Sequence, residues 1–398
     1  MFNQATTDFI QKHRYDDVRT LALQSGKSVD EDVDLLAAFI QIAGRQTAEH
    51  KIPSWYLRDD IIYPVKLALE QCSSERTARY KAALLSGHSF VDITGGFGVD
   101  TAFIAPKFVQ SGYVEKQEPL AEVARRNFSA LGLSVKVHST NGISHLGRME
   151  PVDCLYIDPS RRMPSDKKSV LIEDCEPNII DIQHLLLKKA ETVLIKLSPM
   201  LDIHSALKVL VGVNEIHIVS VDNECKELLF LLKNVSRKDP LVVCSNLMKQ
   251  GEWVDSFRLS EENDAQIKYS PEVRRFIYEP NASLMKAGFY KSIALQYGVE
   301  KLHPNTHLYT SYRYIKDFPG RIFQVKAVSS MKTSELSKAL SDVKNANITV
   351  RNFPLTVAEL RKKLKIYDGG EIYLFATTLS DGQLVIVKAS KLKQGEEE

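Results

Sequence analysis

The sequence predicts an α/β protein centred on a doubly wound parallel sheet, with helices before it and a smaller α+β region after it. Three observations lead to this prediction. Apolar residues recur at helical spacing in the first 88 residues, strand-like and helix-like segments alternate from residue 89, and the alternation resumes from about residue 320. Strands that alternate with helices form parallel sheets, because each helix returns the chain to the same edge. The expected domains are residues 1–88, 89–238, 239–320 and 321–398.

The first domain is expected to be helical throughout. Helical spacing runs through residues 30–56, with a break at Pro53. A later helix can begin after a cap at Ser73 or Ser74 and end at Gly87, because serine favours helix starts and glycine favours helix ends.

The second domain is expected to hold the sheet. Its strands are predicted at residues 89–93, 112–116, 134–138, 152–157, 192–197 and 215–221, and its helices at 99–106, 119–131, 178–190 and 201–210. The apolar run 224–232 fits either a helix or a strand. We favour a strand in an antiparallel hairpin at the sheet edge, because the turn-forming residues Asp222 and Asn223 separate two apolar runs.

The last two domains are expected to be smaller α+β regions. A strand pair with a loop at Gln250-Gly251, followed by a helix at 281–297, is predicted before residue 320. The final domain reads as strand, helix, strand, helix, strand and strand. Residues 321–393 contain 13 Lys/Arg and 6 Asp/Glu. This basic balance is compatible with a polyanionic partner or with a solvated helix face.

The overall composition is that of an ordinary globular protein. The chain has 398 residues, of which 44% are hydrophobic and 26% charged, with a formal net charge of +2. The start has no apolar core of the signal-peptide type, and no apolar run is long enough to span a membrane. Five scattered cysteines form no CxxC pair and no metal-binding spacing. We therefore expect a cytoplasmic protein with no metal site and no membrane partner.

The segment "FVDITGGFGVDTAFIA", residues 90–105, carries the strongest local signal. Gly95, Gly96 and Gly98 lie between a strand and a helix, where a tight turn brings the backbone close to a ligand. Ligands of doubly wound sheets bind at the carboxyl ends of the strands, so a nucleotide-like ligand is expected. A dinucleotide motif would need a third glycine, but Thr101 occupies that position. Instead, Asp92 precedes the loop.

The pattern Asp92-x-x-x-Gly96-x-Gly98 resembles the first motif of class I S-adenosylmethionine-dependent methyltransferases, and the likeness extends over residues 89–235. The segment "YVEKQEPLAEVARRNFSALGL" is similar to their second motif, which implies that Glu115 binds the ribose hydroxyls. "VKVHSTNGISHL" is similar to the third and places Asn141 near the adenine. The resemblance implies S-adenosyl-L-methionine as the cofactor. The residues that it assigns to cofactor binding are Asp92, Thr94, Gly95, Gly96, Gly98, Asp100, Glu115, Asn141 and Asp158.

The segment "CLYIDPSRRM" resembles the [D/N]-P-P-x motif of nucleic-acid methyltransferases. In that motif the acidic or amide side chain holds the acceptor in line for a single displacement, so the protein supplies alignment. The resemblance assigns catalysis to Asp158, Pro159, Ser160 and Arg161, and substrate binding to Arg162. Because Ser160 stands in place of the second proline, the motif does not identify the methyl acceptor. The two arginines could instead form surface ion pairs.

A covalent mechanism of pyrimidine C5 methylation is disfavoured. It needs a nucleophilic cysteine, but Ser198-Pro199 stands where similar enzymes place one. Cys154 lies in an apolar strand and is expected in the core. Cys175 is expected in a loop among carboxylates, which disfavour its thiolate.

The whole chain resembles bacterial class I methyltransferases with a ferredoxin-like unit and a THUMP-like C-terminal domain. The likeness rests on "EQCSSERTARYK", "DITGGFGVDT", "DPSRR", "NECKELLFLL" and "RNFPLTVAELRKKLKIYDGGEIYLFATT". It implies methylation of structured RNA, tRNA or rRNA, at a base nitrogen. The alternatives are a small-molecule or protein methyltransferase, and a non-catalytic RNA-binding protein. Arg361, Lys362 and Lys363 are expected to contact RNA phosphates. The oligomeric state stays open.

Overall fold

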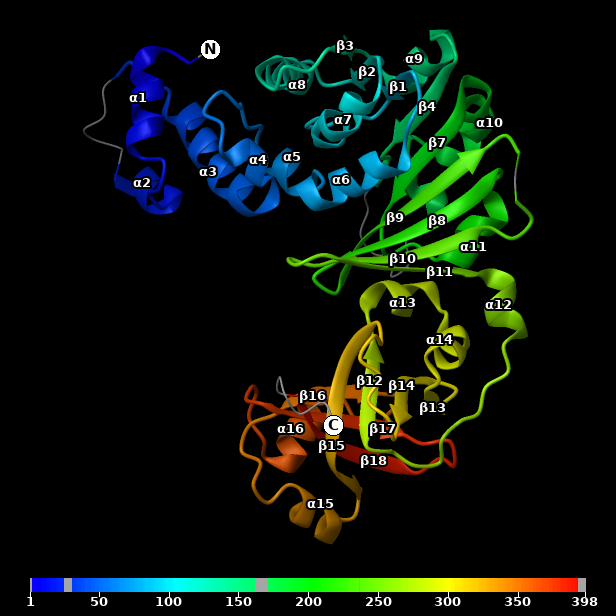
Figure 1. Ribbon diagram of the computed structural model, residues 1–398. Coiled ribbons are helices and arrows are strands. Elements are labelled where there is room, and N and C mark those ends of the chain that lie inside the picture. The colour runs from blue at the N-terminus through cyan, green and yellow to red at the C-terminus, as the bar shows by residue number, and fades with distance from the viewer. Residues whose placement is uncertain (1, 25–30, 162–170, 236, 393–398) are drawn as a thin grey trace. The chain divides into compact units, whose positions relative to one another are not determined.

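The computed structural model describes residues 2–24, 31–161, 171–235 and 237–392 (Figure 1). The chain forms two compact units. The first comprises Met1–Ile216 with Glu227–Lys238, and the second comprises His217–Lys226 with Asp239–Glu398. Among the described residues, no helix is both long and apolar enough to cross a membrane.

The first unit begins with helices, as the sequence predicts. They are α1 (Gln4–Lys12), α2 (Val18–Gln24), α3 (Leu35–Lys51), α4 (Pro53–Tyr56), α5 (Lys66–Gln71) and α6 (Glu75–Leu84). Pro53 separates α3 from α4 because proline is tolerated at the first position of a helix. Ser74 caps α6, and its hydroxyl accepts from the Thr77 N–H. The predicted end at Gly87 is wrong, since α6 already ends at Leu84 and the chain turns extended at Leu85.

The doubly wound sheet follows the helices. Its strands are β1 (Ser89–Asp92), β2 (Gln110–Glu115), β3 (Val135–Ser139), β4 (Val152–Ile157), β7 (Ala190–Leu197), β8 (Val213–Val221) and β9 (Glu224–Lys233), in the order β8-β9-β7-β4-β1-β2-β3. The connecting helices are α7 (Val99–Ile104), α8 (Glu118–Ala130), α9 (Gly142–Arg148), α10 (Ile179–Lys189) and α11 (Ile203–Val209), with a short helix η1 (Ala105–Lys107) after α7. Strand β1 pairs in parallel with both β2 and β4, so the strand order reverses beside β1. The carboxyl ends of β1 and β4 therefore form the crevice where ligands of such sheets bind.

Strands β8 and β9 form the predicted hairpin. Asp222 and Asn223 have φ values of 48° and 66°, the conformation that tight two-residue hairpin turns require. Strand β9 runs antiparallel to β7. The prediction that this hairpin lies at the sheet edge is wrong, because in the second unit β10 (Leu241–Leu247) lies beside β8 and β11 (Glu252–Arg258) lies beside β10. The turn residues determine that a hairpin forms, but they do not determine which strands lie beside it in the sheet.

The second unit also contains a seven-stranded sheet. Its strands are β12 (Phe276–Pro280), β13 (Glu300–His303), β14 (Thr306–Ser311), β15 (Gly320–Ser330), β16 (Asn347–Arg351), β17 (Ile372–Thr378) and β18 (Leu384–Lys391), in the order β13-β14-β12-β15-β18-β17-β16. Its helices are α12 (Leu259–Asp264), α13 (Ala282–Ala287), α14 (Tyr290–Tyr297), α15 (Thr333–Ala339) and α16 (Val357–Leu364). The single helix predicted at 281–297 is wrong, because Gly288 adopts φ +81° and ends α13.

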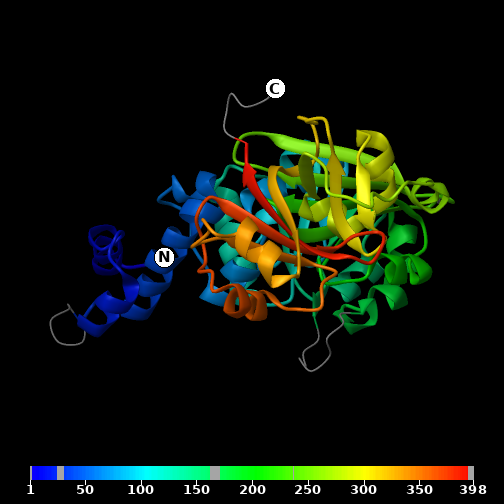
Figure 2. The same ribbon diagram turned by 90° about the horizontal axis from the view of Figure 1, so that it is seen from below.

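This sheet curves so that β14 and β17, near its two ends, meet around an apolar core. The Thr306 hydroxyl in β14 lies 3.1 Å from the Thr377 hydroxyl in β17 and donates to the Thr378 carbonyl at 3.2 Å. Phe323 and Phe375 are fully buried between these ends. On the other face of β17 and β18, α15 and α16 cover a second apolar cluster (Figures 1 and 2). Strand β15 pairs with both β12 and β18, which makes one sheet of residues 276–391.

Candidate active site

Hydrogen bonds to Asp92 fix the start of the glycine loop between β1 and α7. This residue is 2% exposed, and its carboxylate accepts from the Thr94 N–H at 2.9 Å and the Thr101 hydroxyl at 2.7 Å. Burial raises the pKa of Asp92 to about 7, although the hydrogen bonds from Thr101 and Thr94 oppose the shift. Asp92 thus ties the loop to the first turn of α7.

The three glycines of the loop serve different purposes. A Cβ on Gly95 would lie 2.2 Å from the ring of Tyr113, and one on Gly98 would lie 2.9 Å from the ring of Phe128. These two glycines are required by packing against β2 and α8. Gly96 has φ +57°, and a Cβ there would meet only the Thr94 carbonyl oxygen, at 3.8 Å. Gly96 is therefore the glycine whose open side a ligand can approach.

Glu115, at the end of β2, lies directly against this loop. It is 7% exposed, and its two carboxylate oxygens accept from the Gly96 N–H at 2.9 Å and the Gln117 N–H at 2.8 Å. Its backbone carbonyl accepts from the Thr140 N–H at 3.0 Å. Asn141 follows at the same edge, but its side-chain oxygen accepts from the Ser144 N–H and caps α9.

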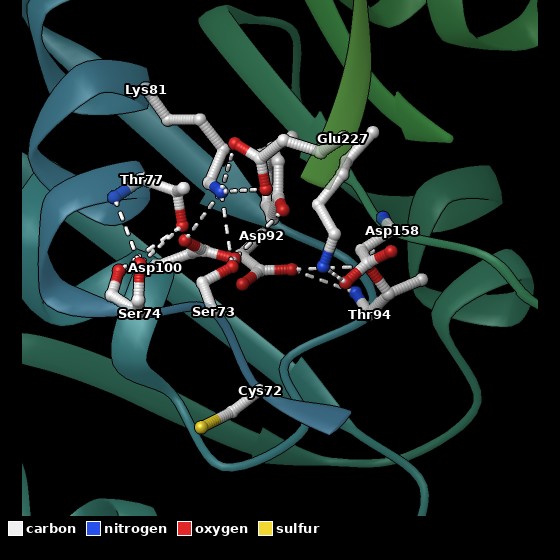
Figure 3. A network of polar contacts seen from close by, with 12 residues as sticks. Cys72, Ser73, Ser74, Thr77, Lys81, Asp92, Thr94, Asp100, Asp158 and Glu227 are labelled. Carbon is white, nitrogen blue, oxygen red and sulfur yellow. Dashed lines mark hydrogen bonds and ion pairs between the residues drawn. The ribbon is translucent and has the colours of Figure 1, made fainter. Parts of the chain in front are cut away.

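Asp158 follows β4 and is held from two sides. Its backbone N–H donates to the Thr94 hydroxyl at 2.7 Å, so it is linked to the glycine loop (Figure 3). Its carboxylate forms an ion pair with Lys196 of β7. Burial lowers the pKa of Lys196, but the carboxylates of Asp158, Asp100 and Glu227 outweigh this effect and raise it. The lysine therefore stays charged beside Asp158.

The rest of the DPSRR segment leaves the sheet. Pro159 is buried, and the exposed Ser160 donates from its hydroxyl to the Glu176 carbonyl at 3.2 Å. Strand β5 (Ser160–Arg161) pairs with β6 (Cys175–Glu176), so the backbone of Arg161 lies opposite Cys175. Arg162 lies outside the described residues.

The two cysteines considered for covalent chemistry are both buried. Cys154 lies in the core as predicted, and burial raises the pKa of its thiol to about 11. The loop position predicted for Cys175 is wrong, because it lies in β6 and is 5% exposed.

Sequence analysis did not identify the buried polar network behind the loop. The Lys81 ammonium group in α6 is fully buried and donates to both oxygens of Glu227 in β9, at 2.8 and 2.7 Å (Figure 3). It also lies 3.2 Å from the carboxylate of Asp100. Asp100 accepts from the hydroxyls of Ser73 and Tyr156, each at 2.8 Å. The carboxylate of Asp100, predicted to bind the cofactor, is thus occupied inside the protein.

One signal for this network was present in the sequence. Glu227 directly precedes the apolar run 228–232 of β9, where an unpaired buried carboxylate would be costly and a cationic partner was to be expected. Burial raises the pKa of Glu227 despite the opposing effect of Lys81 and Lys196. The sequence does not show which cation is the partner.

Comparison with known proteins decides the family. Family models match a ferredoxin-like domain at residues 276–319 and a THUMP domain-like region at residues 320–390. A protein from Porphyromonas gingivalis W83, provisionally described as a methyltransferase, has a crystal structure similar to the whole chain. It is 33% identical over 98% of each chain, with a TM-score of 0.88. The chain belongs to this methyltransferase family. The predicted class I methyltransferase fold, with its ferredoxin-like unit and THUMP-like domain, is confirmed.

More distant structures match parts of the chain. One is a provisionally assigned class I S-adenosylmethionine-dependent methyltransferase from Listeria monocytogenes, 12% identical over 61% of this chain and 84% of its own, with a TM-score of 0.38. Another is an O-methyltransferase from Bacillus cereus in complex with S-adenosylhomocysteine, 13% identical over 47% of this chain and 100% of its own, with a TM-score of 0.32. A search of curated proteins gave no match.

S-adenosylmethionine is the cofactor of this methyltransferase family, as predicted. The residues at the carboxyl edge of β1 and β2 suit it. Gly96 is open on one side, and the buried carboxylate of Glu115 keeps acceptor capacity beyond the two backbone N–H groups that it binds. Among the described residues, no group of three or more His, Cys, Asp or Glu side chains is arranged to hold a metal ion.

The predicted RNA-contacting residues lie on α16 of the THUMP-like domain. Arg361 forms an ion pair with Asp368 and donates to the Ala346 carbonyl at 3.4 Å, so its guanidinium group holds the domain together. Lys362 and Lys363 are exposed on the same helix. Of the three predicted residues, Lys362 and Lys363 are exposed and Arg361 is partly buried.

Proposed function

We propose that this methyltransferase methylates a nitrogen atom of a base in structured RNA, either tRNA or rRNA. The position of Asp158 is the observation that carries the proposal. It follows β4 at the crevice beside β1, its N–H is bound to Thr94 of the glycine loop, and its carboxylate is paired with Lys196. A carboxylate fixed from two sides suits a reaction that depends on alignment.

The proposed chemistry needs few protein groups. S-adenosylmethionine supplies an activated methyl group when it is bound. The carboxylate of Asp158 accepts a hydrogen bond from the N–H of the acceptor nitrogen, which turns the nitrogen lone pair toward the methyl group, and the same carboxylate takes up the proton that this nitrogen loses. Lys196 keeps the carboxylate oriented, and Pro159 restricts the backbone beside it.

Four features favour RNA as the substrate class. The THUMP-like domain covers residues 320–390, and residues 321–393 carry an excess of Lys and Arg. Lys362 and Lys363 are exposed on α16, where they can approach phosphates. The segment DPSRR also resembles the motif of nucleic-acid methyltransferases, which favours RNA over a small molecule.

Mass spectrometry of nucleosides tests this proposal. Nucleosides of tRNA and of rRNA from a strain that lacks the gene are compared with those of its parent. We expect one methylated nucleoside to disappear, to return with the wild-type gene, and to stay absent with Asp158→Ala. Identical nucleosides in both strains would refute an RNA substrate, and a methylated metabolite or protein lost instead would assign the alternative.

A further inference from the structure

A cavity of about 280 Å³ opens on the second unit. It is lined by Tyr314, Arg321, Ile322, Lys391 and Leu392. These residues come from the loop after β14, the start of β15, and the end of β18 with the residue after it. The volume lies near the lower limit of ligand pockets, so it suits a group the size of one nucleotide. Its lining combines one aromatic ring with two cations.

Tyr314, the aromatic residue that lines this cavity, is fixed by hydrogen bonds to its neighbours and by a ring contact. The hydroxyl of Tyr278, whose side chain is fully buried, donates to the Arg313 carbonyl at 2.6 Å and accepts from the Ile315 N–H at 3.2 Å. These two backbone groups flank Tyr314. The ring of Tyr314 also contacts the ring of Phe276, with centroids 5.7 Å apart. Tyr314 therefore meets a ligand with little loss of conformational freedom.

Arg321 is oriented by a buried carboxylate. Its Nε donates to Glu279 at 2.8 Å, and its Nη2 donates to the same oxygen. Arg351 donates to the other oxygen of Glu279 at 2.9 Å. The Glu279 side chain is 5% exposed, whereas those of Arg321 and Arg351 are 42% and 39% exposed. Two arginines on one carboxylate leave an excess positive charge, and the Nη1 of Arg321 is not used in this ion pair.

Lys391 supplies the second cation. Strands β15 and β18 pair Phe323 with Lys391, which brings this lysine close to Arg321 on the neighbouring strand. Its ammonium group lies 5.6 Å from the ring centroid of Tyr373. Within residues 2–392, as far as they are described, Lys391 forms no ion pair with a carboxylate. Lys391 therefore offers an anion in the cavity a positive charge that no described carboxylate neutralises.

We propose that this cavity binds one nucleotide of a single-stranded RNA segment, with Tyr314 against the base and Arg321 and Lys391 on the adjoining phosphates. Single-stranded nucleic acid is bound by aromatic side chains that stack on bases beside cations that follow the backbone. A simple anion would require the cations but not the ring. The choice of RNA over another anionic ligand rests on the proposed function.

Direct binding to the full-length protein tests this site. The probe is a fluorescein-labelled single-stranded decauridylate, and fluorescence anisotropy gives its affinity at several salt concentrations. Tyr314→Ala is expected to weaken binding about tenfold, because stacking on an aromatic side chain is lost. Tyr314→Phe keeps the ring and should bind like the wild type. Substitution of Arg321 is avoided, since it would leave Glu279 with one partner fewer.

The lysine is tested by its salt dependence. Lys391→Gln is expected to reduce the slope of log K against log salt concentration by about 0.7, as for one lost phosphate contact. Lys338→Gln, an exposed lysine on α15, is the matched control and should leave the slope unchanged. The rise in melting temperature with S-adenosylhomocysteine should be the same in all variants, which shows that they are folded.

Each outcome decides between the site and the proposed function. Wild-type affinity in both Tyr314→Ala and Lys391→Gln would overturn the site and leave the RNA substrate intact. Weakened binding in these variants, without any RNA nucleoside that depends on the gene, would support the site and refute the proposed function. No binding of decauridylate by the wild type would overturn the site, while the nucleoside comparison would still decide the proposed function. If the wild type bound polyglutamate as tightly as decauridylate, the cavity would be a general anion site. The proposal that it binds a nucleotide would then be wrong.

Discussion

Replacing Lys81 with methionine removes a fully buried cation while keeping most of the side-chain volume. The Lys81 ammonium group donates to Glu227 at 2.8 and 2.7 Å and to the Ser73 hydroxyl at 3.0 Å, and it lies 3.2 Å from the Asp100 carboxylate. Glu227 and Asp100 are 3% and 8% exposed. Without Lys81, two buried carboxylates would face each other with one cation fewer.

Breaking a buried ion pair in this way costs about 3–5 kcal/mol, because the remaining charge stays desolvated and unpaired. For a unit of this size, each kcal/mol corresponds to about 2–4 °C, so the melting temperature should fall by about 6–20 °C. The loss should shrink at low pH. Burial raises the pKa of Glu227 in the folded protein, so the folded state binds its proton more tightly than the unfolded state, and protonation removes the unpaired charge.

Calorimetry of the wild type and three variants at pH 5 and pH 8 measures these effects. Lys66→Met is the matched control, because this lysine is 78% exposed on α5 and, among the described residues, forms an ion pair with Glu70 alone, at 3.5 Å. Its substitution should change stability by less than about 0.5 kcal/mol. Lys81→Met combined with Glu227→Leu should recover part of the loss, since the charge is removed with its partner. If Lys81→Met lowers the melting temperature no more than Lys66→Met, the network does not stabilise the fold.

Four further predictions concern the site. Glu115→Gln should lower the affinity for S-adenosylhomocysteine in calorimetric titration by about tenfold or more, because hydrogen bonds to a charged acceptor are worth about 1.5–3 kcal/mol; unchanged affinity would exclude Glu115 from the cofactor site. Asp158→Ala should reduce methyl transfer by about a hundredfold or more and leave cofactor affinity within a few-fold; equal loss of both would place Asp158 on the cofactor side. Lys362→Gln with Lys363→Gln should raise the apparent KM for RNA and lower its salt dependence, and an unchanged salt slope would identify a solvated helix face. Because burial raises the folded-state pKa of Asp92 from 3.8 to about 7, stability should decline as the pH rises from about 4 to about 7 and level off above it. In denaturant titrations, the stability of Asp92→Asn should depend less on pH than that of the wild type. An equal decline in both proteins would contradict the raised pKa of Asp92.

Local patterns in the sequence were sufficient for most of the fold. Alternating strands and helices from residue 89 predicted the doubly wound sheet, since the periodicity of apolar residues depends on each element alone. The strand at 224–232 was predicted from the turn residues Asp222 and Asn223, and β9 spans Glu224–Lys233. Predictions failed where a local signal did not fix the outcome. Gly288 breaks one predicted helix into two, and Gly87 lies beyond the end of α6.

The candidate site divides in the same way. The sequence alone indicated the glycine loop, because it directly follows a predicted strand, and the resemblance to methyltransferase motifs indicated Glu115 and Asp158. Only the tertiary structure showed why two of the glycines are needed, since Tyr113 and Phe128 reach them from β2 and α8. The sequence indicated where these chemical groups stand along the chain but not what they contact.

The partners of the charged groups came from the tertiary structure alone. Lys81 and Glu227 are separated by 146 residues, and Asp158 and Lys196 by 38. The order of strands in the sheet decides which side chains meet, and that order follows from the packing of the whole unit rather than from any one segment. A buried charge in the sequence therefore predicts that a partner exists, while only the folded chain can supply its identity.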